Sequence, residues 1–150
     1  MLSAGVALAG AKTGKLFVVI DRGIEKSMNE GQVKNRDQVG EWMEMDLVKL
    51  LEKAGYDAEL INSKADYKPS AGSHLLTVKI TDYNPGSKAA RMFVGYGAGA
   101  TSMKTHYDIL DSSSKPIGSD DLGVGSSRDW RNVVRKIDEQ TVAAVKEKMN

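Results

Sequence analysis

The chain has 150 residues, a length typical of one domain, and its 21 basic and 20 acidic side chains nearly balance. This balance excludes the strong overall field that would attract nucleic acid or an anionic membrane, so we expect no nucleic-acid partner. The absence of cysteine excludes disulfides, thiolate catalysis and Cys-based metal sites, and two histidines are too few for a His-rich metal site.

The chain begins with small and apolar residues. Residues 1–11 are too short to span a bilayer, which needs about twenty residues. Ala7-Leu8-Ala9 has the small-x-small form that signal peptidases recognise. We therefore predict that residues 1–14 are a signal-peptide remnant or a disordered tail, and that residues 15–150 form a single domain.

The first half of that domain reads as strand, helix and strand. Residues 15–20 are a continuous β-branched and aromatic run, typical of a strand covered on both faces. The polar residues 21–38 are predicted to be a long connection. A helical apolar stripe follows over residues 41–54 and ends at Gly55, after which residues 56–61 form a short strand. The stripe comprises Trp42, Met45 or Met43, Leu47, Leu50, Leu51 and Ala54.

The second half contains two alternating strands and one helix. Apolar and polar residues alternate over residues 75–83 and again over residues 103–110, which predicts strands with one buried face. A turn is expected at residues 111–115, followed by a Gly-rich polar stretch with a short edge strand near Ile117. Residues 128–149 carry a nearly unbroken apolar stripe and are predicted to form the second helix.

These elements predict an α+β fold: a mostly antiparallel sheet with two amphipathic helices packed on one face. The two alternating strands need one covered face, and the two helices can supply that cover.

The most unusual segment is residues 86–99, where an arginine precedes an apolar run and three glycines at alternate positions. Gly95, Gly97 and Gly99, with Arg91, are the candidate binding residues of the chain, for a small ligand or a nucleotide. A phosphate cradle needs a glycine turn that feeds a helix, whereas these glycines run into an alternating strand. We therefore favour a bend between two strands, with Arg91 as a structural residue at its approach.

Other chemistry-bearing residues are scattered. Asp108, Asp111 and His106 are the residues available to a hydrolase, but no nucleophile motif accompanies them. Asp120 and Asp121 would point to opposite faces of an extended chain and make a poor catalytic pair. We therefore predict no catalytic residues, no metal site and no cofactor, and a protein that is not an enzyme.

The pattern G-S-x-A-A-R-x-x-x-G-x-G-A-G over residues 86–99 resembles a family of uncharacterised bacterial cell-envelope proteins, a domain of unknown function with many lipoproteins. The resemblance implies a periplasmic location, anchored at the outer membrane in lipidated members, and a non-enzymatic adaptor or binding role. Its implied partner is another envelope protein, or the membrane through a lipid anchor that this sequence lacks, since position 11 is Ala. The alternative is a ligand- or nucleotide-binding domain that uses the glycine segment.

Overall fold

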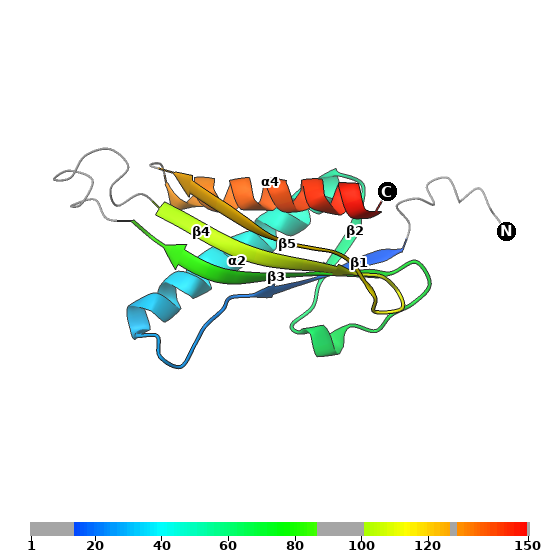
Figure 1. Ribbon diagram of the computed structural model, residues 1–150, viewed down its shortest axis with the longest axis horizontal. Coiled ribbons are helices and arrows are strands. Elements are labelled where there is room, and N and C mark those ends of the chain that lie inside the picture. Colours follow the sequence, from blue (N-terminus) through cyan, green and yellow to red (C-terminus); the bar gives the residue numbers. More distant parts are fainter. Residues whose placement is uncertain (1–13, 87–100, 127–128, 150) are drawn as a thin grey trace.

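The computed structural model describes residues 14–86, 101–126 and 129–149 (Figure 1). Their strands form one five-stranded sheet in the order β2-β1-β3-β4-β5, packed against two long helices. The elements are β1 (Lys15–Asp21), α2 (Glu30–Lys53), β2 (Asp57–Leu60), the 3-10 turn η1 (Lys64–Asp66), β3 (His74–Asn84), β4 (Thr101–Leu110), β5 (Pro116–Ser126) and α4 (Trp130–Met149).

The sheet is mixed, so the prediction of a mostly antiparallel sheet was wrong, although the α+β class is confirmed. β1 runs parallel to both of its neighbours, β2 and β3, whereas β3, β4 and β5 pair in antiparallel fashion. β1 and β2 run parallel because α2 forms a crossover between them, and the connection from β2 through η1 returns the chain in the same direction again for β3. Apolar alternation reports which face of a strand is buried and carries no information on strand direction.

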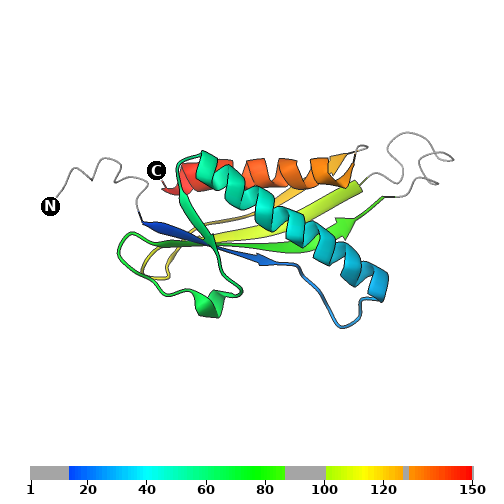
Figure 2. The same cartoon turned by 180° about the vertical axis from the view of Figure 1, so that it is seen from behind.

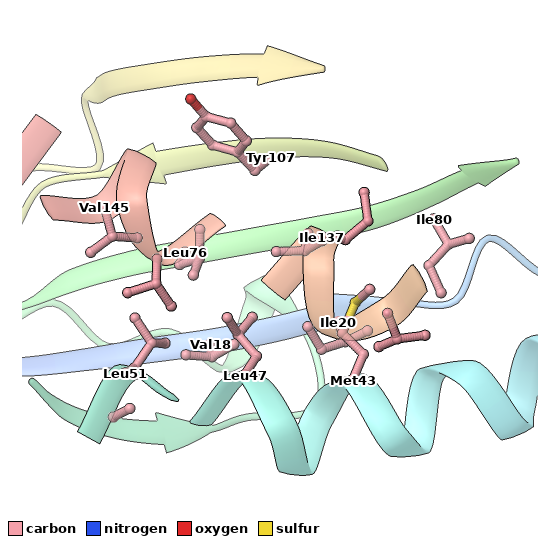
Figure 3. Close-up of a cluster of buried hydrophobic side chains, with 14 of the residues drawn as sticks. Val18, Ile20, Met43, Leu47, Leu51, Leu76, Ile80, Tyr107, Ile137 and Val145 are labelled. Carbon is pink, nitrogen blue, oxygen red and sulfur yellow. The ribbon is translucent and has the colours of Figure 1, made fainter. Parts of the chain in front are cut away.

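Both helices cover the same face of the sheet (Figure 2). α2 packs on β1 and β2, α4 packs on β4 and β5, and the two helices contact each other. Fully buried side chains from both helices and the three central strands meet between these layers, among them Met43, Leu47, Leu76 and Ile137 (Figure 3). Neither of the two long helices covers the opposite face of the sheet, which is called the open face below.

Helix α2 begins at Glu30, inside the segment predicted to be a connection over residues 21–38. Asn29 caps this helix: its side chain accepts from the backbone N–H of Gln32, whose side chain accepts from the Asn29 N–H, at 2.9 and 3.0 Å. The first two turns of α2 have few apolar residues, because only one side of them is buried. They therefore show no apolar stripe from which a helix could be predicted. Gly55 ends the helix region with φ +100°, as predicted.

Strand β5 is also longer than predicted. It extends over eleven residues instead of a short piece near Ile117, and it pairs with β4 along that length. The sequence PIGSDDLGVGS has low strand propensity, so the ladder with β4 and the packing of α4 beneath it sustain the strand. The expected turn at residues 111–115 forms the hairpin between them, with the Asp111 N–H donating to the Lys115 carbonyl at 2.9 Å.

Candidate functional site

The open face divides into an apolar end and a polar end. At the apolar end, Phe17, Leu75 and Leu110 pack with Tyr67 from the loop after η1. The Phe17 and Tyr67 rings meet edge to face at 5.6 Å, and the Tyr67 hydroxyl donates to the Asp111 carbonyl at 3.2 Å. This loop therefore covers the apolar end and leaves the polar end of the face exposed.

A groove of about 600 Å³ lies at the polar end. Its walls come from the end of β1 and the loop after it, from the loop after β2, and from the middle of β3 and β4. Most of the lining side chains can donate or accept hydrogen bonds: Asp21, Arg22, Asn62, Ser63, Lys64, Thr77, Lys79, His106 and Asp108. Their positive and negative charges are interspersed, so the groove is polar without a strong net field.

Strand register explains how side chains distant in sequence meet here. In antiparallel pairs, residues directly opposite share a face, and β4 places His106 between Lys79 of β3 and Asp121 of β5. Asp21 of β1 pairs with Lys79 in turn, so one row of charged side chains crosses four strands. The next row contains Asp108 opposite Ser119.

His106 is the centre of this arrangement. Its Nδ1 lies 2.7 Å from Asp121 Oδ1, and its Nε2 lies 3.1 Å from Ser119 Oγ and 3.4 Å from Asp108 Oδ2. The hydrogen bond to Asp121, supported by the charge of Asp108, raises the pKa of His106 above its ordinary value. A carboxylate therefore lies near each nitrogen, and both carboxylates stabilise the protonated imidazole relative to a free side chain.

The order Ser119, His106, Asp121 matches the connectivity of a nucleophile, a base and an orienting carboxylate. A general base must accept a proton, however, and Nε2, the nitrogen that faces Ser119, also lies 3.4 Å from an oxygen of Asp108, which favours a proton on that nitrogen. The side chain of Asp121 is also 83% exposed, so solvent screens its electrostatic interaction with the imidazole ring. This geometry favours an ion cluster that can bind a polar ligand over a nucleophilic centre.

The wall formed by the loop after β1 is held in place by α2. Arg22 pairs with Asp37 and Glu44, each at 3.0 Å. Arg36, which is buried, donates to the carbonyls of Arg22, Gly23 and Ile80 at 2.9, 3.0 and 3.2 Å. These bonds bind the loop to both α2 and β3, so this side of the groove is preformed.

The candidate residues predicted from the sequence are not all among the described residues. Arg91, Gly95, Gly97 and Gly99 lie outside the described residues, in the segment that joins β3 to β4, and their binding role stays a prediction. Of the scattered candidates, Asp108 lies beside His106. Asp111 instead accepts backbone N–H bonds from Ser113 and Lys115 within its turn, which lowers the pKa of its carboxyl.

Sequence reasoning missed Ser119, Asp121 and Lys79 as parts of one site. The signal available was their place on strands, since alternation puts His106 and Asp108 on one face of β4. Their cross-strand partners could be named only with the register of β5, a strand that was predicted too short. As expected, Asp120 and Asp121 face opposite sides, because Asp120 lies opposite the core residue Tyr107.

In the part of the chain that the structure describes, the His, Asp and Glu side chains include no group of three or more placed to hold a metal ion. No helix there is long and apolar enough to cross a membrane.

Comparison with known families identifies the chain. The model of a domain of unknown function, DUF4410, matches residues 8–121. The chain belongs to the DUF4410 family. This confirms membership of a domain-of-unknown-function family and carries no information on location in the cell. No curated protein matches the chain.

Solved structures show the same fold at low sequence identity. The PelC dodecamer from Paraburkholderia phytofirmans aligns with a TM-score of 0.60 and 13% identity, over 89% of each chain. A dodecameric PelC variant from the same organism aligns with a TM-score of 0.54 and 12% identity, over 93% of this chain and 90% of that one. At this identity the likeness is one of fold.

Proposed function

We propose that this DUF4410 protein is a non-enzymatic binding or adaptor module of the bacterial cell envelope, located on the periplasmic side. The observation that carries the proposal is the open-face groove. It offers hydrogen-bonding side chains from three strands and two loops on a preformed wall, which suits recognition of a polar partner. The carboxylates on both sides of His106 favour binding over nucleophilic chemistry.

The envelope location is supported by the apolar start of the chain, with its small-x-small Ala7-Leu8-Ala9. Outer-membrane anchoring and an envelope protein partner belong to the same proposal. We also propose that the protein works as a homo-oligomer, because PelC, which shares its fold, is a dodecamer in two structures.

Location can be tested by fractionating cells that express the full-length gene with a chromosomal epitope tag. The tagged protein should appear in the periplasmic or membrane fraction, alongside a periplasmic marker. A product found only with cytosolic markers would overturn the envelope part of the proposal.

Binding can be tested by titrating the labelled protein with neutral sugars, sugar phosphates, nucleotides and short peptides while amide shifts are recorded. Saturable shifts at Thr77, Lys79 and His106 are expected, and Lys79→Ala should weaken them. Lys104→Ala is the matched control, because Lys104 lies on the same face of β4 but outside the groove. Saturable shifts confined to Gly95, Gly97 and Gly99 would favour the alternative, a ligand or nucleotide site at Arg91 and the glycines.

A further inference from the structure

The contact between helices α2 and α4 contains a buried acid that the proposed function does not use. The side chain of Asp138 is 0% exposed, and neither of its carboxylate oxygens has a hydrogen-bond partner among the described residues. Buried polar side chains in native proteins nearly always have such a partner, so an unpartnered carboxylate in the interior is rare.

Asp138 lies beside the ion pair that joins the two helices. Arg135 of α4 donates to both carboxylate oxygens of Asp46 of α2, with N–O distances of 2.6 to 3.0 Å. Asp46 is buried, whereas the side chain of Arg135 is 46% exposed. Leu47 and Ile137, the chain neighbours of the two acids, are fully buried between the helices and the sheet (Figure 3). The three charged residues, called the carboxyl cluster below, therefore lie between the core and solvent.

The charges of the carboxyl cluster balance only when it holds one proton. Two ionised carboxylates beside one guanidinium leave one negative charge in excess, and an unbalanced charge away from water is strongly unfavourable. With a proton on Asp138 the charges balance, and the carboxyl O–H can donate to Asp46. Burial, together with the neighbouring Asp46, accordingly raises the pKa of Asp138 well above its ordinary value.

The other charged groups near this contact do not take the place of the proton. Glu139, an exposed acid of α4, is the next charge that acts on Asp138, and it favours the protonated form as well. From the sheet, Tyr83 and Tyr107 face the helices, and they interact with charges just before α4 and in its last turn. A proton on Asp138 is therefore what neutralises the carboxyl cluster.

Each helix has its own support on the sheet. α2 packs on β1 and β2, α4 packs on β4 and β5, and the two helices meet between these supports (Figure 2). The contact between the helices can therefore loosen while each helix stays on its strands. A groove of about 370 Å³ adjoins this contact, with Asp46 and Arg135 in its wall beside the apolar side chains of Trp42, Met45 and Leu60. A looser contact would widen this groove.

We propose that the carboxyl cluster makes the contact between α2 and α4 depend on a proton: the helices stay together while Asp138 is protonated and move apart when it ionises. In the closed form, Asp46 accepts from both Asp138 and Arg135. In the open form, water reaches the two carboxylates and stabilises the unbalanced charge. This behaviour does not depend on the partner or the location proposed above.

The pH dependence follows from proton linkage. In the open form Asp138 is solvated and has the ordinary pKa of an aspartate, about 4, whereas in the closed form its pKa is raised. Between these two values the open form has lost a proton that the closed form keeps. The ratio of open to closed molecules should therefore rise about tenfold for each pH unit in this range and level off above it.

The test measures the distance between the helices as the pH is raised. The chain has no cysteine, so spin labels can be attached at Lys49→Cys on α2 and Gln140→Cys on α4, which are both exposed positions. Pulsed electron paramagnetic resonance then gives the distance between the labels. One distance is expected at mildly acidic pH, and a longer one should appear and grow as the pH rises.

Asp138→Asn is the decisive variant, because an amide has the shape of the protonated carboxyl, can donate to Asp46 and cannot ionise. It should keep the short distance at every pH. Glu139→Gln is the matched control, since it removes an acid at the neighbouring exposed position of the same helix. The longer distance should still appear in this control as the pH rises.

The titration of Asp138 in the wild-type chain, followed by carbon-13 NMR, does not require any variant to fold. It should coincide with the change in distance between the labels. The inference is overturned by a single distance at every pH at which circular dichroism shows the chain folded. It is equally overturned by a longer distance that persists in Asp138→Asn, or by an Asp138 carboxyl that titrates at its ordinary pKa. None of these results bears on the open-face groove or on the envelope location.

Discussion

Met43 and Met45 provide a sharp test of the packing of α2, because they are the same residue type two positions apart on one helix. The side chain of Met43 is fully buried between the helices and the sheet (Figure 3). Met45, in contrast, is 62% exposed. Helix propensity changes little from Met to Ala and changes equally at both positions. The difference between Met43→Ala and Met45→Ala therefore measures burial.

The magnitude follows from that burial. Burying a methionine contributes about 1.5–3 kcal/mol, and the cavity left by its removal adds to the loss, so Met43→Ala should lower the free energy of unfolding by about 2–5 kcal/mol. A loss of about 3 kcal/mol corresponds to a decrease in Tm of roughly 6–12 °C in a domain of this size. Met45→Ala should stay within about 0.5 kcal/mol of the wild type in the monomer.

The assay is urea unfolding followed by circular dichroism. The loss in Met43→Ala should exceed the loss in Met45→Ala by about 1.5 kcal/mol or more. Equal losses in the two variants would refute the reasoning, because the two side chains would then contribute alike to the core.

Two further predictions concern titration. Desolvation, with Asp46 as its nearest acidic neighbour, raises the pKa of Asp138, so the folded state holds a proton that the unfolded state loses above about pH 4. Stability should then fall as pH rises from 4 to 7; Asp138→Asn should remove this fall and be more stable than the wild type at pH 7, measured by urea unfolding across pH. For His106, an NMR titration of the ring should give a raised pKa, and Asp121→Asn should lower that pKa. Asp120→Asn, a change at the residue next to Asp121, is the control for this titration and for the unfolding series. The stability linked to His106 should be present below its unfolded pKa and be lost as pH rises through its folded pKa; a ring pKa unchanged by Asp121→Asn would contradict the bond.

The buried carboxyl of Asp138 shows what the helical pattern alone did not reveal. The α4 stripe was correctly predicted from its 3.6-residue period, and Val133, Val134, Ile137 and Val145 are fully buried. Asp138 is buried beside them because α2 crosses α4 at this point. With both carboxyls ionised, neither Asp138 oxygen has a hydrogen-bond partner among the described residues, whereas a protonated Asp138 can donate to Asp46.

Local signals determined most of the elements of this protein. Period-two alternation was enough for β3 and β4, the apolar run for β1, and Gly55 for the end of α2, because each depends on a few neighbouring residues. The start of α2 was missed although Asn29 and Gln32 form a capping box, since its first turns lack an apolar stripe.

Tertiary structure alone decided strand direction, strand register and the candidate site. The parallel pairing of β1 depends on the crossover through α2, and the length of β5 depends on pairing with β4. The glycine–arginine segment was the feature that sequence could pick out, because its residues are adjacent. The open-face groove brings Asp21, Lys79 and His106 together from three strands, and such a site exists only once those strands are paired.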